Sequence, residues 1–165
     1  MTDGRPLAAG DMDTLRVALA GHPFCVDLDA AHIDALAEIA GEVTFADGTF
    51  ILRHGHPADG LHLIISGDLA LEIADPGREP HLIASLHGGD VLGWSWLFPP
   101  RRWAFDARSI GPVTLLKLDA ARLLELIDAD ARFGRDLALR IGLIVVERLQ
   151  ATRAQVVDIR HHDHT

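Results

Sequence analysis

The stretch from Gly88 to Ala107, GGDVLGWSWLFPPRRWAFDA, holds the residues best suited to chemistry. Gly93 permits a sharp change of direction, and the five residues after it are enough for one helical turn. Pro99–Pro100 must end that turn, because proline has no N–H for a helix to use. Arg101 and Arg102 follow at once. Guanidinium groups beside a helix N-terminus are the chemistry of an anion site, above all a phosphate site. The plainer interpretation is a surface corner with two solvated arginines.

The order of these residues resembles the phosphate-binding cassette of cyclic-nucleotide-binding domains, as in Crp/Fnr-type regulators and the protein kinase A regulatory subunit. The family's cassette reads Gly-Asp, two residues, Gly-Glu, a short helix, Pro-Arg-Ala-Ala and a strand. This chain has Gly89-Asp90, Gly93 and Pro100-Arg101 at matching spacing. The upstream pattern also fits, with Gly48, Ile51, Gly55, Leu61–Ile65, Ser66-Gly67 and Leu69. The resemblance runs from Gly41 to about Asp158 and implies a domain of this fold.

The residues at the family's ligand-binding positions differ from the pattern. Trp94 stands where the family has the Glu that accepts from the ribose 2′-OH, and Trp96 and Trp103 stand where small residues make room for the cyclic phosphate. Arg102 replaces another small residue, and Arg101 keeps the phosphate-pairing position. Indole rings occupy volume that a nucleotide would need. The candidate ligand-binding set is Gly93, Trp94, Ser95, Trp96, Arg101, Arg102 and Trp103, and the candidate ligands are cyclic AMP and cyclic GMP.

The arginines allow two further arrangements that would fill the cassette from within. Arg102 could stack on Trp103 or Trp94 and act as a cation–π lid. Asp106 is close enough in sequence to pair with either cassette arginine and neutralise the phosphate site. We expect such a self-filled cassette rather than an open one.

Histidines suggest a second kind of site. His54 and His56, with a glycine six positions before His54, match the opening of a cupin metal motif. The Glu that the cupin pattern requires next is missing from residues 57–60, and neither His81 nor His87 stands in the second cupin motif. We therefore expect polar histidines in a surface turn and no metal site. The tail cluster His161, His162 and His164 is typical of a mobile terminus.

No catalytic constellation is recognisable in the chain. There is no nucleophile elbow, no P-loop and no dinucleotide fingerprint, and no acidic pair is spaced for proton transfer. We expect no catalytic residues and no enzymatic activity. The lone Cys25 excludes an internal disulfide, and we expect it to be a small buried hydrophobe.

The composition limits the kinds of partner that we expect for this chain. The 165 residues are 48% apolar and 24% charged, as in an ordinary globular domain with appended helices. Fifteen basic against 24 acidic residues give a net charge of −9, which argues against a nucleic-acid surface. No export segment or membrane span is recognisable. We expect a cytoplasmic protein with neither nucleic-acid nor membrane partners.

Hydrophobic periodicity predicts a mainly β fold with flanking helices, a jelly-roll-like β-barrel of about eight short strands. The expected strands cover 43–45, 50–52, 61–65, 69–74, 81–86, 91–92, 103–109 and 113–118. Ser66-Gly67-Asp68 reads as a tight hairpin. A short helix is expected around 15–19, and a second from an Asp29 cap through Ile39, ended by Gly41.

Two C-terminal helices are expected after the barrel. Asp119 should cap one through Ile127, and Asp128 or Asp130 a longer one to about Asp158. The long helix carries two apolar lines, Leu137, Ile141 and Ile144 in one and Leu139, Leu143 and Val146 in the other. In the resembling family this is the dimer helix, so we expect a homodimer through it. The alternative is a helix lying wholly on its own barrel.

The expected organisation is 1–40 for the N-terminal tail and helices, 41–118 for the barrel with cassette 88–107, 119–158 for the C-terminal helices and 159–165 for a tail. The function that we expect is a stand-alone regulatory or interaction module without enzymatic activity or a DNA-binding domain, read by a protein partner. The alternative is a cyclic-nucleotide or other phosphate sensor that holds its ligand through Arg101 in an altered pose. A more distant alternative is a cupin-like metal protein.

Overall fold

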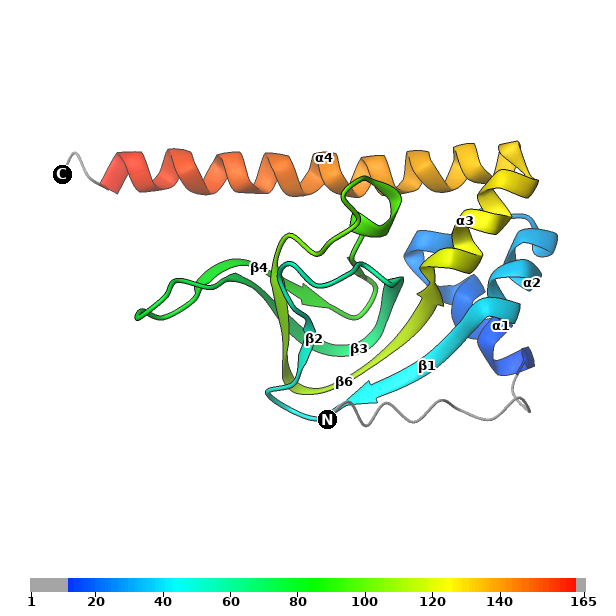
Figure 1. Cartoon of the computed structure of the whole chain (residues 1–165), viewed down its shortest axis with the longest axis horizontal. Helices are drawn as coiled ribbons and strands as arrows, with labels where there is room; N and C mark the ends of the chain where they lie inside the picture. The colour runs from blue at the N-terminus through cyan, green and yellow to red at the C-terminus, as the bar shows by residue number, and fades with distance from the viewer. Residues whose placement is uncertain (1–11, 163–165) are drawn as a thin grey trace.

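A computed structural model describes residues 12–162, and for 155–162 it describes the backbone alone (Figure 1). The helices are α1 (Met12–Gly21), η1 (Pro23–Cys25), α2 (Ala30–Ile39), η2 (Ser95–Leu97), α3 (Ala120–Ala129) and α4 (Ala131–His162). The strands are β1 (Ala40–Phe45), β2 (Phe50–Leu52), β3 (Gly60–Ile73), β4 (His81–His87), β5 (Val91–Leu92) and β6 (Asp106–Asp119).

The strands form one antiparallel sheet around two long central strands. Its order is β1-β6-β3-β4, with β2 paired to β6 and β5 paired to β3. Within the described residues β1 and β4 do not pair with each other, so the sheet curls without closing. Figure 1 shows α1, α2 and α3 gathered at one end of the sheet, and α4 starting there and running along the molecule.

The described chain has six strands rather than the expected eight, because two expected turns are bends inside longer strands. β3 covers 61–65 and all but the last residue of 69–74, and its pairing with β6 shifts register twice around Gly67. Ser66-Gly67-Asp68 is therefore a bulge and not a hairpin, which corrects the prediction. β6 likewise continues through Gly111 at φ 75° and begins only at Asp106.

The helix predictions hold, with changes at the ends. Asp119 Oδ2 accepts from the N–H of Arg122 at the start of α3, and Asp130 Oδ1 accepts from two N–H groups in the first turn of α4. Gly41 does not end α2, because Ala40 is already extended and opens β1. α4 reaches His162, so 159–162 is helix and not tail. Residues 1–11 and 163–165, including His164, lie outside the described chain.

Alternation along the strands divides the core in two. In β6, Leu116 and Leu118 face a core shared with the helices, whereas Val113 and Leu115 face the interior of the curled sheet. Trp96 belongs to the helix-side core and Trp103 to the sheet interior. The cassette thus supplies one indole to each half of the core.

Cys25 lies among the residues of the helix-side core. Cys25 is buried, and burial raises the pKa of its thiol to about 11, which agrees with the expected packing role. Among residues 12–162, no helix is long and apolar enough to cross a membrane.

Candidate functional site

The cassette begins with a turn that Asp90 closes, as its sequence predicts. Asp90 Oδ2 accepts from the N–H of His87 at 2.8 Å, and the Gly89 N–H donates to the Ile64 carbonyl at 2.8 Å. β5 then pairs with β3, and Gly93 at φ 86° turns the chain into η2. This helix has only three residues and ends at Leu97, so the expected single turn before the prolines is confirmed.

Trp103 fills the space beside Gly93. Its side chain is buried, and a methyl group built on Gly93 would lie 2.7 and 2.8 Å from two carbons of the indole ring. On its other side Trp103 meets His62, with ring centroids 5.9 Å apart. The indole therefore occupies the room that a small residue would leave open next to the Gly93 backbone.

Trp96 is fully buried in the helix-side core and does not line the cassette cavity. Its Nε1–H donates to the Gly93 carbonyl at 3.2 Å. This bond ties η2 back onto the turn that precedes it. Trp96 thus acts as a packing residue, although the sequence placed it in the ligand-binding set.

The two cassette arginines lie outside this interior. Both are exposed, and neither lines the cavity. Arg101 has φ 56°, its N–H donates to the Phe98 carbonyl and its own carbonyl accepts from Ala58. Arg102 Nη1 donates to the Gly55 carbonyl at 2.8 Å. The cassette backbone is therefore pinned here with both guanidinium groups on the surface.

Neither of the self-filling contacts expected from the sequence forms. Arg102 does not stack on an indole of the cassette. Asp106 does not pair with a cassette arginine, because its Oδ1 accepts from the backbone N–H of His54 at 2.8 Å. Both side chains use backbone partners instead.

Arg148, from α4, stacks on a cassette indole instead. The guanidinium carbon of Arg148 lies 4.5 Å from the centre of the Trp94 ring, and Nη2 donates to the Val91 carbonyl. Burial lowers the pKa of Arg148 to about 10. The sequence prediction missed this residue, although Arg148 continues the buried line Leu137, Ile141 and Ile144 at helical spacing.

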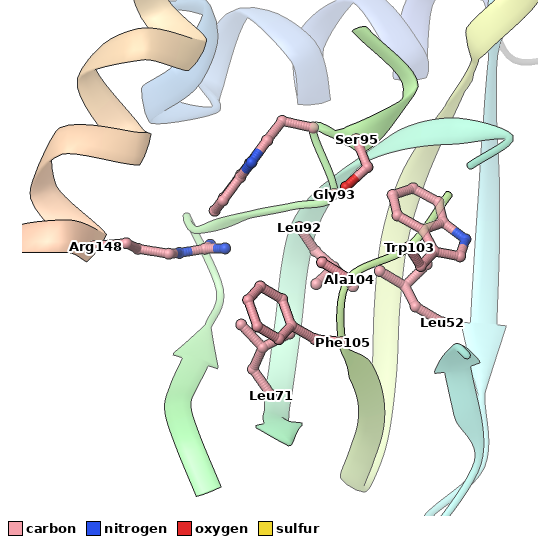
Figure 2. Close-up of a pocket in the computed structure, with 10 residues that line it drawn as sticks. Leu52, Leu71, Leu92, Gly93, Ser95, Trp103, Ala104, Phe105 and Arg148 are labelled. Carbon is pink, nitrogen blue, oxygen red and sulfur yellow. The ribbon is translucent and has the colours of Figure 1, made fainter. Parts of the chain in front are cut away.

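A cavity of about 40 Å³ remains between the curled sheet and α4 (Figure 2). Its lining residues come from β2, β3, β5, the cassette and α4, namely Leu52, Leu71, Leu92, Gly93, Trp94, Ser95, Trp103, Ala104, Phe105 and Arg148. Four of the seven predicted site residues are among them. Sites for small organic ligands usually measure about 300–1,000 Å³, several times this volume.

His54 and His56 are exposed in the turn after β2. In the described part of the chain, no group of three or more His, Cys, Asp or Glu side chains is gathered as a metal ion would require. Arg108, the third arginine near the cassette, pairs with the buried Glu72 across β6 and β3, at 2.7 Å from Nη2 to Oε1.

Comparison with known proteins places the chain in a family. The family model for the cyclic nucleotide-binding domain matches residues 42–130, which is more than half of the chain. The chain belongs to the cyclic-nucleotide-binding domain family. The resemblance seen in the sequence is thereby confirmed.

Individual relatives agree with this assignment. The cAMP-dependent protein kinase regulatory subunit of Dictyostelium discoideum is 32% identical over 99 residues, which is 55% of this chain and 30% of that protein. The chain thus spans under a third of that relative. A crystal structure of a putative cyclic nucleotide-binding protein from Geobacter metallireducens has a TM-score of 0.72 at 25% identity, covering 87% of this chain and 99% of the other. A domain from Methylobacillus flagellatus has a TM-score of 0.78 at 16% identity, covering 94% and 89%, and shares the fold.

The contact between Gly93 and Trp103 predicts an unusual sensitivity at this glycine. Gly93→Ala should destabilise the protein by more than the roughly 1–3 kcal/mol that a left-handed residue costs by itself, because the new methyl meets a buried ring. Gly77→Ala is the matched control, since Gly77 has φ 78° and nothing within 4 Å of its added methyl. Urea unfolding of both variants measures the difference. Equal losses would contradict the packing described here.

His62 predicts a loss of stability in acid. Burial, reinforced by nearby Lys117, lowers the pKa of His62 to about 4 from the ordinary 6.5. Between these values the unfolded chain binds a proton that the folded chain does not, so the free energy of unfolding should fall as pH drops from about 6.5 to about 4, by roughly 3 kcal/mol. His62→Gln should lack this component. Denaturant unfolding of both proteins across the range tests it, and parallel pH profiles would contradict it.

Proposed function

We propose that this chain is a non-enzymatic regulatory or interaction module whose ligand cassette no longer accepts a cyclic nucleotide. It keeps the family's fold and gives its output through contacts with other proteins in the cytoplasm. The observation that carries the proposal is the indole of Trp103 against the Gly93 backbone. Trp94, at the position of the family's Glu, is covered by Arg148 and offers no carboxylate for a ribose hydroxyl.

The positions of the charged groups support the same proposal. A phosphate in the cassette would need a guanidinium facing the interior. Arg101 is exposed, and its backbone is held by bonds to Phe98 and Ala58. Bringing its side chain to the cavity would require the 98–103 segment to rearrange. The name of the Dictyostelium relative supports a regulatory rather than a catalytic role.

The second candidate function is a sensor for a cyclic nucleotide or another phosphate ligand in an altered pose. The exposed Arg101, which has no ion-pair partner within the described chain, favours it, because its charge is available to an anion. In this case the ligand would sit at the outer side of the cassette. The cupin-like metal alternative has only the exposed pair His54 and His56 in its favour.

A titration separates the first two candidates. We expect cyclic AMP and cyclic GMP to give no saturable heat at millimolar concentration and no rise in the melting temperature, because the indoles fill the site. Arg101→Ala should behave like the unaltered protein. Saturable binding at micromolar affinity would contradict the proposal. If Arg101→Ala then abolished this nucleotide binding, the result would establish the second candidate function, since the phosphate would have lost its charge partner.

We also propose that the module is a homodimer through α4. One line of this helix, with Leu137 and Ile141, packs into the helix-side core, whereas Leu139, Leu143, Val146 and Leu149 are exposed, Leu143 by 61%. Their spacings of four, three and three residues place them on one face, as in helices that pair. Burying such a face against a second copy removes it from water.

Leu143→Glu tests the dimer, because a charge in an apolar seam should abolish pairing. Light scattering after gel filtration should give twice the chain mass for the unaltered protein and the chain mass for the variant. Val17→Glu is the control, since Val17 is an apolar residue of α1 and is 73% exposed. A monomer at micromolar concentration, or a dimer that survives Leu143→Glu, would contradict the proposal.

A further inference from the structure

The turn after β2 and the end of the cassette are joined by backbone hydrogen bonds. The Gly55 N–H donates to the Trp103 carbonyl at 2.8 Å, and the Trp103 N–H donates to the His56 carbonyl at 2.9 Å. Two segments that are far apart in the sequence, 53–58 and 98–102, therefore lie side by side. We call these two segments together the tip surface. The bonds hold its backbone in place before any partner arrives, which lowers the entropy cost of binding.

The tip surface is basic, although the protein as a whole is acidic. Its eleven residues include three arginines and two histidines and no Asp or Glu. The chain has a net charge of −9 with these three arginines included, so the rest of the chain carries −12. A local positive surface on a negatively charged molecule draws an anionic group to one place. The charge pattern therefore indicates a partner with negative charge.

The acids nearest to this surface in the sequence are engaged with other groups. Asp59 Oδ2 accepts from Lys117 Nζ at 2.6 Å, and Asp106 Oδ1 accepts from a backbone N–H in the turn after β2 at 2.8 Å. Arg101 and Arg102 are exposed, and neither takes part in an ion pair within the described chain. Their positive charges are therefore available to groups from outside.

An exposed aromatic ring accompanies the arginines. Phe98 is 52% exposed, and its carbonyl accepts from the Arg101 N–H at 2.8 Å, so the two residues are the ends of one tight turn. Arg102 Nη1 donates to the Gly55 carbonyl, which orients that guanidinium group. Aromatic residues and arginine are enriched in protein–protein interfaces. A ring beside guanidinium groups fits a peptide that has both acidic and apolar side chains.

We propose that the tip surface docks a short acidic segment of a partner protein, whose carboxylates pair with Arg101 and Arg102 while an apolar side chain packs on Phe98. This inference rests on the proposed function, because it names the chemistry of the protein that the module contacts. Guanidinium groups bind carboxylates through charge-assisted hydrogen bonds. A short segment stays within the tip surface, whereas a membrane or a long nucleic acid would extend over the acidic rest of the molecule and be repelled.

The test uses a fluorescein-labelled peptide of glutamates around a central phenylalanine, and the same peptide with glutamine in place of glutamate. Fluorescence anisotropy on the full chain should show saturable binding of the glutamate peptide, with the glutamine peptide at least about tenfold weaker, because the charge-assisted pairs are lost. Arg101→Glu combined with Arg102→Glu should weaken the glutamate peptide by more than about tenfold. Arg78→Glu combined with Arg122→Glu is the control, since it changes the net charge equally at exposed arginines outside the tip surface. It should leave the affinity within about twofold.

A second variant covers the case in which the double arginine variant does not fold. Phe98→Ala removes an exposed ring and keeps both arginines, and it should weaken the glutamate peptide by about three- to tenfold. No saturable binding, equal binding of the two peptides, or full binding in every folded tip-surface variant would each overturn the inference.

Two other classes of partner are tested beside the peptides, namely vesicles of phosphatidylserine and a single-stranded oligonucleotide. Tighter binding of either one than of the glutamate peptide, lost in the double arginine variant, would overturn the inference in favour of that class. Failure of the peptide together with the cyclic nucleotides overturns this inference alone, whereas binding of a cyclic nucleotide overturns the proposed function.

Discussion

The packing of the Trp103 indole on the backbone of Gly93 is the contact on which the cassette depends. Gly93 must turn the chain out of β5 at a positive φ, and the ring then leaves no room for a side chain at this position. Because Trp103 also closes the interior of the curled sheet against His62, the turn, the core and the site are parts of one packed unit. A domain of this family with a small residue at position 103 would have a space here.

The long helix α4 packs against this unit from outside. Leu137 and Ile141 fix α4 to the helix-side core, and Arg148, further along the same face, reaches the cassette and covers Trp94. The residues that approach the cassette and those that remain exposed thus lie on opposite faces of one helix.

Much of this arrangement follows from the sequence, and the failures have physical causes. Asp90, Asp119 and Asp130 form the turn and caps that their positions predict, because these bonds are local. The strand count failed at Gly67 and Gly111, since a glycine within an alternating pattern permits either a turn or a bulge and only the partner strand decides. The contacts expected to fill the cassette were predicted wrongly. Arg102 and Asp106 find backbone partners 47 and 52 residues away, and Arg148 arrives from 54 residues beyond Trp94. Side-chain pairings across such separations depend on packing that no local pattern contains.

The central claim is that the tryptophans exclude a cyclic nucleotide from the cassette, and the chain offers a direct way to observe them. All three tryptophans of the protein are Trp94, Trp96 and Trp103, so protein labelled with 5-fluorotryptophan reports on the cassette alone by fluorine NMR. Single Trp→Phe substitutions assign the three resonances. The account predicts that none of them shifts or broadens when millimolar cyclic AMP or cyclic GMP is added. A saturable shift of the Trp103 resonance with either nucleotide would contradict it, because a ligand would then share the space beside Gly93.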